Sequence, residues 1–431
     1  MYKIEKGPPE MALIKPFKAF YYNLDIVKDF SNVVTQPFDE ITLRMEEEYR
    51  RRSPFNAVRI IKGDFNDTKR VLNEWIKKGV FVQETEESIY AYDRIYSLMG
   101  ELKVQKGFIA LGRLSPYNTG IIRPHEKTFP DAVKLQFDFL KSTHSHLGPI
   151  FTLYKDESYS VESLIEPFKK VSPVIEAEDW YGNIHKIWRI SDLKVISKVQ
   201  KIMKDKYLII ADGHHRYEAS LRYAEYKNFD EVFTYRMMAF VNVYPRENIS
   251  ILPIYRLVSV SNMDAFLRNL NSKFYLYKKP LEDLEQRLYP DEEDFAIYLG
   301  NNYYFVLKKK QQSFDEISFK GVPKEFRNLS TVVLEKLILP LIDVDNSMIS
   351  YETNLKRAIK EAKESKKILF ILKPPTIEQI DNITKAGLLM PEKSTNFYPK
   401  LLNGLLLNRF EEDISLKKSE IYVEESSLRE I

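Results

Sequence analysis

The residues best suited to chemistry stand in one short run, ADGHHR at 211–216. Apolar residues precede this run and a helical pattern follows it, so the sequence predicts a buried strand, a glycine turn and a helix start. The free backbone N–H groups at a helix start form a seat for an anion, here at Gly213 and His214. His215 and Arg216 would add charge-assisted donors suited to phosphate oxygens. Asp212 would hold Mg²⁺ or cap the helix, and a plain helix cap with two surface histidines is the alternative.

A second candidate lies in the run RPHEKT at 123–128, before a predicted helix. His125 and Glu126 are adjacent and offer a general base or a metal ligand. We predict Glu126 as a catalytic residue, and Arg123 with His125 as substrate-binding residues. An ordinary structural loop is the alternative for this segment.

A third candidate is the proline-bounded loop MPEKSTNFYPK at 390–400. It combines lysines, hydroxyls and two aromatic rings, which suit contacts to a phosphate and stacking on a base. The predicted nucleotide contacts are Lys393, Ser394, Thr395 and Lys400. A charged surface loop is the alternative.

All six histidines lie between residues 125 and 215, which favours a functional centre in that part of the chain. His144 and His146 form a His-x-His pair, which we interpret as lining a turn. No HExxH zinc motif, GxxxxGK[ST] loop or GxGxxG loop is present. The sequence therefore supports zinc weakly and excludes the two commonest nucleotide-binding loops.

Short strand-like and helical segments alternate without a fixed period, and they must position these candidates. The pattern predicts strands over 14–22, 56–61, 107–114, 149–154, 184–190, 206–211, 295–299, 303–307 and 367–372. It predicts helices over 39–51, 67–79, 129–141, 192–204, 216–227, 331–337, 353–362 and 376–385. Many short strands mixed with helices, without a long βα succession, predict an α+β fold with mixed sheets.

The composition limits the classes of protein that need consideration. The 431 residues suit two or three domains, and the formal charge of +3 (65 basic, 62 acidic residues) argues against nucleic acid as a partner. With no cysteine, thiol, disulfide and zinc-thiolate chemistry is excluded. No apolar run approaches the ~18–20 residues that a membrane span needs, and we expect no membrane partner and a cytoplasmic protein.

We expect three regions and a tail. They are an N-terminal α+β region at 1–105, a core with the HE and DGHHR motifs at 106–246, a C-terminal α+β region at 247–410 and an acidic tail at 411–431. The composition leaves open whether the chain forms a homo-oligomer.

Together these motifs resemble the family called domain of unknown function 1015. The resemblance rests on five motifs that follow one another along the chain: IIRPHEKT, GPIFTLY, HKIWRI, ADGHHRYEA and MPEKSTNFYPK. It runs from about Pro16 to Gly404. The chain departs from the family at 36–41, where QPFDEI replaces a PPYDVI-like run, and at Tyr255, where a histidine is usual.

The DGHHR turn also resembles the phosphate-binding turn of the ParB/sulfiredoxin superfamily, which includes kinases of free L-serine. The resemblance implies a ParB/sulfiredoxin-like core and a kinase that uses Mg²⁺ with ATP or ADP. The superfamily's acidic, glycine, histidine and arginine positions fall on Asp212, Gly213, His215 and Arg216. Sulfiredoxin's reactive cysteine would fall on His214, so that redox reaction is excluded.

The sequence thus predicts phosphoryl transfer from a nucleotide to a small hydroxylated metabolite, most concretely L-serine. In this prediction the catalytic residues are Glu126, Asp212 and His215. Glu126 is the general base, with His125 in reserve, and Asp212 holds the metal or orients the acceptor. His215, together with Arg216, stabilises the transferred charge. A nucleotide-binding regulatory protein and a metal-dependent hydrolase built on the histidines are the alternatives.

Overall fold

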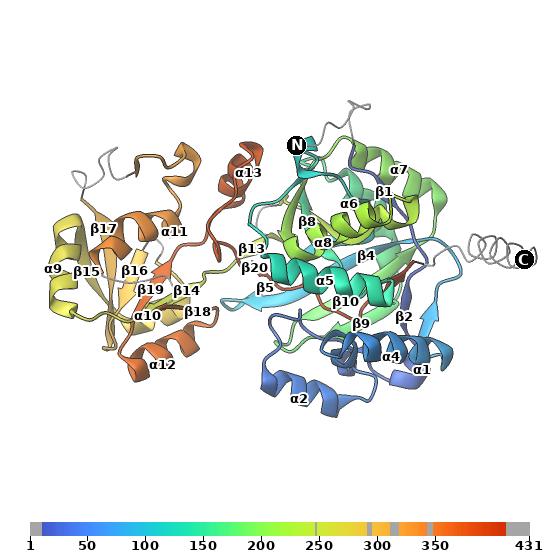
Figure 1. Cartoon of the computed structure of the whole chain (residues 1–431), viewed down its shortest axis with the longest axis horizontal. Helices are drawn as coiled ribbons and strands as arrows, with labels where there is room; N and C mark the ends of the chain where they lie inside the picture. Colours follow the sequence, from blue (N-terminus) through green and yellow to red (C-terminus); the bar gives the residue numbers. More distant parts are fainter. Residues whose placement is uncertain (1–10, 246–247, 291–294, 311–318, 343–347, 411–431) are drawn as a thin grey trace, which may run out of the picture.

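The computed structural model describes residues 11–245, 248–290, 295–310, 319–342 and 348–410, which form a larger and a smaller lobe (Figure 1). Each lobe is built on its own sheet with helices packed against it, and this sheet is mixed in the larger lobe and antiparallel in the smaller one. The predicted α+β fold class is therefore confirmed. In this described part of the chain, no helix is both long enough and apolar enough to cross a membrane.

The larger lobe contains a nine-stranded sheet with the order β6-β11-β8-β12-β5-β4-β10-β9, and β1 pairs with β5. Its strands are β1 (Ile14–Lys15), β4 (Ile89–Leu98), β5 (Glu101–Arg113), β6 (Ile122–Arg123), β8 (Ile150–Tyr154), β9 (Ile175–Glu178), β10 (Ile184–Ile190), β11 (Leu208–Asp212) and β12 (Tyr235–Asn242). Strand β11 buries Ile209 in the core on one face and Ile210 in the core on the other. Burial on both faces explains its continuous apolar sequence, and it ends at the polar turn.

Helices cover both faces of this sheet. They are α1 (Leu24–Val27), α2 (Leu43–Arg52), α3 (Val58–Ile61), α4 (Phe65–Lys77), α5 (Pro130–Thr143), α6 (Ser160–Ile165), α7 (Leu193–Lys204) and α8 (His214–Tyr226). Helices α5 and α8 pack on the same core through Val133, Leu140, Tyr217 and Tyr223. The predicted cap of α7 is confirmed, since the Asp192 side chain accepts hydrogen bonds from the amides of Lys194 and Val195.

The strand predicted over 56–61 is wrong, because this segment forms the short helix α3. Val58 and Ile60 are both buried, which imitates the alternation of a strand. However, the Asn56 side chain accepts from the Val58 amide and donates to the Asn32 carbonyl, which starts a turn. A short apolar run cannot distinguish the two structures by periodicity.

The smaller lobe is an insertion in the chain of the larger one. Its six-stranded sheet has the order β15-β17-β16-β19-β14-β18. These strands are β14 (Tyr255–Val258), β15 (Phe274–Pro280), β16 (Phe295–Tyr298), β17 (Tyr303–Lys309), β18 (Ile349–Glu352) and β19 (Ile368–Leu372). Its helices include α9 (Met263–Lys273), α10 (Leu281–Arg287), α11 (Ser330–Val333), α12 (Leu355–Ser365) and α13 (Ile377–Lys385).

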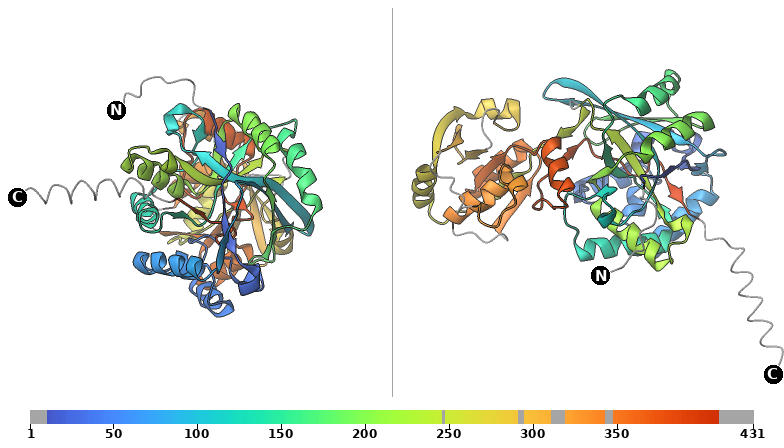
Figure 2. Two further views of the ribbon diagram at one scale, coloured as in Figure 1. Left: turned by 90° about the vertical axis from the view of Figure 1, so that its right-hand side faces the viewer. Right: turned by 90° about the horizontal axis from the view of Figure 1, so that it is seen from above.

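Three two-stranded pairs complete the fold: β2 (Phe20–Tyr22) with β3 (Phe81–Gln83), β7 (Ser145–His146) with β21 (Asn408–Arg409), and β13 (Ser250–Ile251) with β20 (Phe397–Tyr398). Strands β13 and β20 precede and follow the smaller lobe and pair with each other, so the chain leaves and re-enters the larger lobe at one place (Figure 1). Figure 2 shows the two lobes from two further sides. The loop before β20 is thereby held at the junction of the lobes.

The predicted regions differ from this division. The boundary at 105/106 falls inside β5, and β4 pairs with β5 along its length, so the first two regions share one sheet. The segment from β20 to β21 belongs with the larger lobe, because its strands pair with β13 and β7. The predicted acidic tail at 411–431 lies outside the described residues.

Candidate active site

The glycine turn between β11 and α8 is formed as the sequence predicts. Gly213 has a φ of 95°, and a Cβ at this position would lie 3.0 Å from Arg216 Nη2. Both facts require glycine here. Among the described residues no side chain caps the start of α8, so its first-turn amides are available to an anion.

Asp212 is the centre of an ion-pair network at this turn. Its Oδ2 accepts a hydrogen bond from Lys400 Nζ at 3.1 Å, and its Oδ1 lies 3.5 Å from Arg216 Nη2. Burial alone would raise the pKa of Asp212, but the Lys400 ammonium and the Arg216 guanidinium hold that pKa well below its usual range. Arg216 is fixed further because its Nη1 donates to the Pro149 carbonyl at 2.9 Å.

The three histidines near the turn have different environments. His125 and His214 are buried, and the His125 amide donates to His214 Nε2 at 3.3 Å. His215 lines the large cavity described below, stacks on Phe129 and has no hydrogen-bond partner for Nε2 within the described structure. Burial lowers the pKa of all three rings, so His215 is neutral at pH 7 and offers a neutral donor instead of the predicted charge.

The other three histidines lie away from this turn in the fold. His144 ends α5 with a φ of 50°, and His146 accepts a hydrogen bond from the Met237 amide. The Nδ1 atom of His185 lies 2.6 Å from the hydroxyl oxygen of Tyr92. Of the six histidines that cluster in the sequence, three therefore lie at the glycine turn, and the other three make contacts elsewhere in the fold.

Thr395 connects the HE motif to the loop at 390–400. Its Oγ1 lies 2.8 Å from His125 Nε2 and 3.1 Å from Glu126 Oε1. Because the Ile210 carbonyl can only accept, His125 Nδ1 carries the proton of the neutral ring, and Nε2 is left as an acceptor. Thr395 has a single hydroxyl proton, so it can donate to only one of these two acceptors at a time, His125 Nε2 or the Glu126 carboxylate.

Replacing Thr395 by valine is expected to lower the free energy of unfolding by about 1–3 kcal/mol, since His125 Nε2 would be buried without a donor. Urea denaturation measures the change. Thr353→Val is the matched control, since Thr353 is an exposed residue at the cavity and its replacement should change the value by less than about 0.5 kcal/mol. Equal unfolding free energies for the two variants would contradict the role assigned to Thr395.

A cavity of about 820 Å³ brings these elements together. Its wall includes residues from both lobes, among them Tyr351 and Thr353 at the end of β18. Its acidic residues are Asp39, Glu40, Glu126, Asp212 and Glu352, and its lysines and arginines are Lys127, Arg216, Arg236, Arg357, Lys393 and Lys400. This volume and mixture of charges suit a polar ligand with anionic groups.

Glu40 is a cavity residue that the sequence analysis missed. Burial raises the pKa of Glu40 to about 7, against the lowering effect of the Lys400 ammonium. A carboxyl group with such a pKa is matched to proton transfer near neutral pH. The available signal was the acidic pair Asp39–Glu40 after Pro37, but nothing local indicated that Glu40 would be partly buried in a cavity wall.

Nine of the predicted site residues line this cavity: Glu126, Asp212, Gly213, His214, His215, Arg216, Lys393, Thr395 and Lys400. Three do not line it. Arg123 packs its guanidinium 3.7 Å from the Tyr207 ring centre, His125 is buried behind Thr395, and Ser394 donates to the Pro391 carbonyl. The structure thus removes Arg123 and His125 from the surface a substrate would touch.

The fit of Asp212 to a metal ion is poor in this arrangement, because both of its oxygens face cations. Within the described ranges no group of three or more His, Asp or Glu side chains is placed to hold a metal. We therefore derive no step from Mg²⁺ bound at Asp212, and that role stays a prediction.

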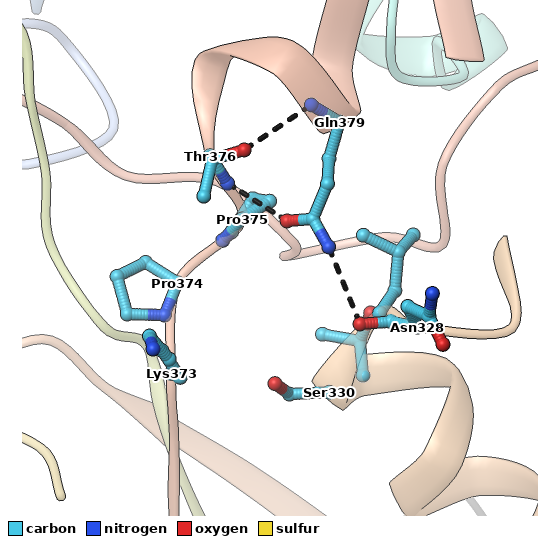
Figure 3. A pocket seen from close by; sticks show the side chains of 9 residues that line it. Asn328, Ser330, Lys373, Pro374, Pro375, Thr376 and Gln379 are labelled. Atoms are coloured by element: carbon cyan, nitrogen blue, oxygen red, sulfur yellow. Dashed lines mark hydrogen bonds between the residues drawn. The ribbon is translucent and has the colours of Figure 1, made fainter. Parts of the chain in front are cut away.

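A second cavity, of about 120 Å³, lies in the smaller lobe between the starts of α11 and α13 (Figure 3). Thr376 and Gln379 form a capping box at the start of α13, and Gln379 Nε2 also donates to the Asn328 carbonyl. None of the predicted site residues lines it.

Comparisons with known proteins add a family and distant structural likenesses. The model of the family "Protein of unknown function (DUF1015)" matches residues 14–332. No curated protein matches the chain. A mutant free serine kinase in complex with ADP is 12% identical with a TM-score of 0.33, covering 70% of this chain and 92% of its own. A conserved hypothetical protein from Pyrococcus furiosus is 13% identical with a TM-score of 0.30, covering 70% of this chain and 95% of its own. C-terminally truncated SbnI from Staphylococcus aureus is 10% identical with a TM-score of 0.34, covering 73% of this chain and 96% of its own.

Proposed function

The chain belongs to the DUF1015 family, and from its cavity we propose that it is a small-molecule kinase. It transfers a phosphoryl group from ATP or ADP to the hydroxyl of free L-serine, giving O-phosphoserine. One observation carries this proposal: a cationic helix start and a carboxyl group with a pKa of about 7 face the same cavity. The choice of serine, and a ParB/sulfiredoxin-like core for the larger lobe, rest on the resemblance of the DGHHR turn.

The cavity residues have distinct parts in this reaction. The amides of Gly213 to Arg216 seat the donor phosphates, and Arg216, Lys393 and Lys400 neutralise their charge. Glu40 takes the proton from the acceptor hydroxyl, whose oxygen bonds to the terminal phosphorus as the bond to the bridging oxygen breaks. A Mg²⁺ ion carried by the nucleotide would share the phosphate charge.

Glu126 has a less direct role in this proposal. Its carboxylate faces Thr395, so it orients the loop that carries Lys393. The residue types alone favoured Glu126 as the base, whereas the raised pKa of Glu40 favours Glu40. Exchange of each for glutamine distinguishes the two assignments, as argued in the Discussion.

The direct test incubates the purified chain with Mg²⁺, L-serine and either ATP or ADP, and reads O-phosphoserine by mass. The native chain is expected to form product with at least one donor. Asp212→Asn should reduce the rate at least about 100-fold, because Lys400 and Arg216 lose the carboxylate that positions them. Asp381→Asn is the control, since Asp381 is paired with Lys155 and Lys385 but lies outside the cavity.

The outcomes separate the alternatives. Nucleotide binding without product from any hydroxylated metabolite would favour the regulatory protein. Absence of nucleotide binding would overturn the phosphate seat. Hydrolysis that requires a tightly held zinc or iron ion after dialysis would favour the metal-dependent hydrolase.

A further inference from the structure

Arg236 is a buried cation in the cavity wall that the phosphate seat does not use. It stands near the start of β12, is 4% exposed, and donates through Nη2 to the Gly148 carbonyl at 3.1 Å. Its Nε and Nη1 have no hydrogen-bond partner in the described part of the chain. Buried donors of a charged group are costly to leave unsatisfied, so acceptors from a ligand are expected here.

The charges around Arg236 are out of balance. No described carboxylate forms an ion pair with it, and the charge that acts on it is the like charge of Arg216. Burial, reinforced by the Arg216 charge, lowers the pKa of Arg236 well below its usual value. The Asp212 carboxylate, which pairs with Arg216, is already shared with Lys400. A further negative charge in the cavity would restore the balance.

Gly148 allows close packing of the side chains around these two arginines. Gly148, Ser145 and Asn403 line the same wall as Arg236. A Cβ on Gly148 would collide with Asn403 Oδ1 and would lie 3.4 Å from Arg216 Nη1. Glycine thus allows Asn403 and Arg216 to pack closely while the carbonyl of residue 148 orients Arg236.

We propose that Arg236, next to Arg216, forms an oxyanion subsite that binds the carboxylate of the acceptor. The inference rests on the proposed function and deepens it, because it selects hydroxy acids and amino acids over polyols and amino alcohols. The donor phosphates have their own seat at the start of α8 and at Lys393, which leaves Arg236 to the smaller ligand. A guanidinium matches the planar carboxylate in shape and in donors.

Isothermal titration tests the subsite without requiring turnover. L-serine, D-glycerate, 2-aminoethanol and ATP are titrated into the native chain and into Arg236→Gln and Arg236→Lys. Arg236→Gln should weaken binding of L-serine or D-glycerate about 10- to 100-fold, as expected for a lost charge-assisted contact. Arg236→Lys, which keeps the charge, should have an intermediate effect. ATP affinity should change less than about twofold, and 2-aminoethanol should bind all three proteins equally weakly.

Arg189→Gln is the matched control, since Arg189 lies on β10 of the same sheet, outside the cavity, and pairs with Glu84. An equal loss of ATP affinity in Arg236→Gln would assign Arg236 to the donor phosphate and overturn the proposal. The proposal would also be overturned if Arg236→Gln bound L-serine and D-glycerate as tightly as the native chain does. It would be overturned equally if the native chain bound neither of these two ligands. If the hydroxy acid binds through Arg236 but no acceptor is phosphorylated, the subsite stands and the kinase proposal fails. If product forms and the KM of the acceptor is unchanged in Arg236→Gln, the kinase proposal stands and the subsite proposal fails.

Discussion

Replacing Glu40 by glutamine is expected to lower kcat by about 100- to 10,000-fold, the usual contribution of a general base. The glutamine keeps the size and polarity of the side chain but cannot accept the hydroxyl proton. The KM of the nucleotide should change little, because the phosphate seat at Gly213 and Arg216 is untouched. Steady-state rates of O-phosphoserine formation measure the effect.

The pH dependence follows from the same carboxyl group. Since burial raises the pKa of Glu40 to about 7, the base is mostly protonated at pH 6 and mostly ionised at pH 8. kcat/KM should therefore rise about tenfold per pH unit below 7 and level off above it, and this limb should be absent in Glu40→Gln.

Thermal unfolding supplies a second readout. A raised carboxyl pKa stabilises the folded chain relative to the unfolded one at low pH, and this contribution is lost as pH rises through 7. Glu40→Gln should therefore gain Tm relative to the native chain at pH 8 but not at pH 4.

Glu126→Gln is the decisive comparison for Glu40. If Glu126 orients the loop through Thr395, its variant should keep the pH limb near 7 and lose less kcat than Glu40→Gln. A limb that disappears in Glu126→Gln and persists in Glu40→Gln would transfer the role of base to Glu126.

Replacing Arg216 by lysine is expected to lower kcat/KM at least about 100-fold, comparable to the loss of a preorganised donor to the transferred phosphoryl group. The guanidinium contacts the Pro149 carbonyl and Asp212 at the same time, and its planar shape fits against Gly213. A lysine ammonium is a single flexible charge and cannot hold both contacts while facing the phosphates. The affinity for ATP or ADP should fall together with the rate.

Arg222→Lys controls for a change of arginine on the same helix. Arg222 is exposed and pairs with Glu218 at 3.1 Å, so its replacement should alter kcat/KM less than about twofold. Full activity in Arg216→Lys, with the fold intact by circular dichroism, would remove Arg216 from the phosphate seat.

The turn could be predicted from the sequence because its determinants are local. An apolar run, one glycine and a helical pattern lie within about twenty residues, and Gly213 has the positive φ that a non-glycine residue would adopt only with strain. The cap at Asp192 is local for the same reason. By contrast, the helix over 58–61 was missed because a contact to Asn32 decides it.

The cavity wall was only partly predictable, because it depends on residues far apart in the chain. Arg236 carried one signal, a charged residue in the apolar strand sequence YRMMAFVN, which marks a buried position but not its neighbours. Glu40 carried only the signal of the acidic pair Asp39–Glu40, which does not indicate its pKa, since that pKa depends on burial and on Lys400, 360 positions later in the numbering.

By itself the sequence determined which chemical groups are present, the α+β class and the strand–turn–helix at Gly213, since these follow from residue type and local periodicity. The tertiary structure decided which groups act together. The pairing of β13 with β20 returns the chain to the larger lobe and brings Thr395 and Lys400 to the turn. Burial in the shared cavity then sets the pKa of Glu40 and leaves two nitrogens of Arg236 without a partner in the described chain, because both effects arise from packing between distant segments.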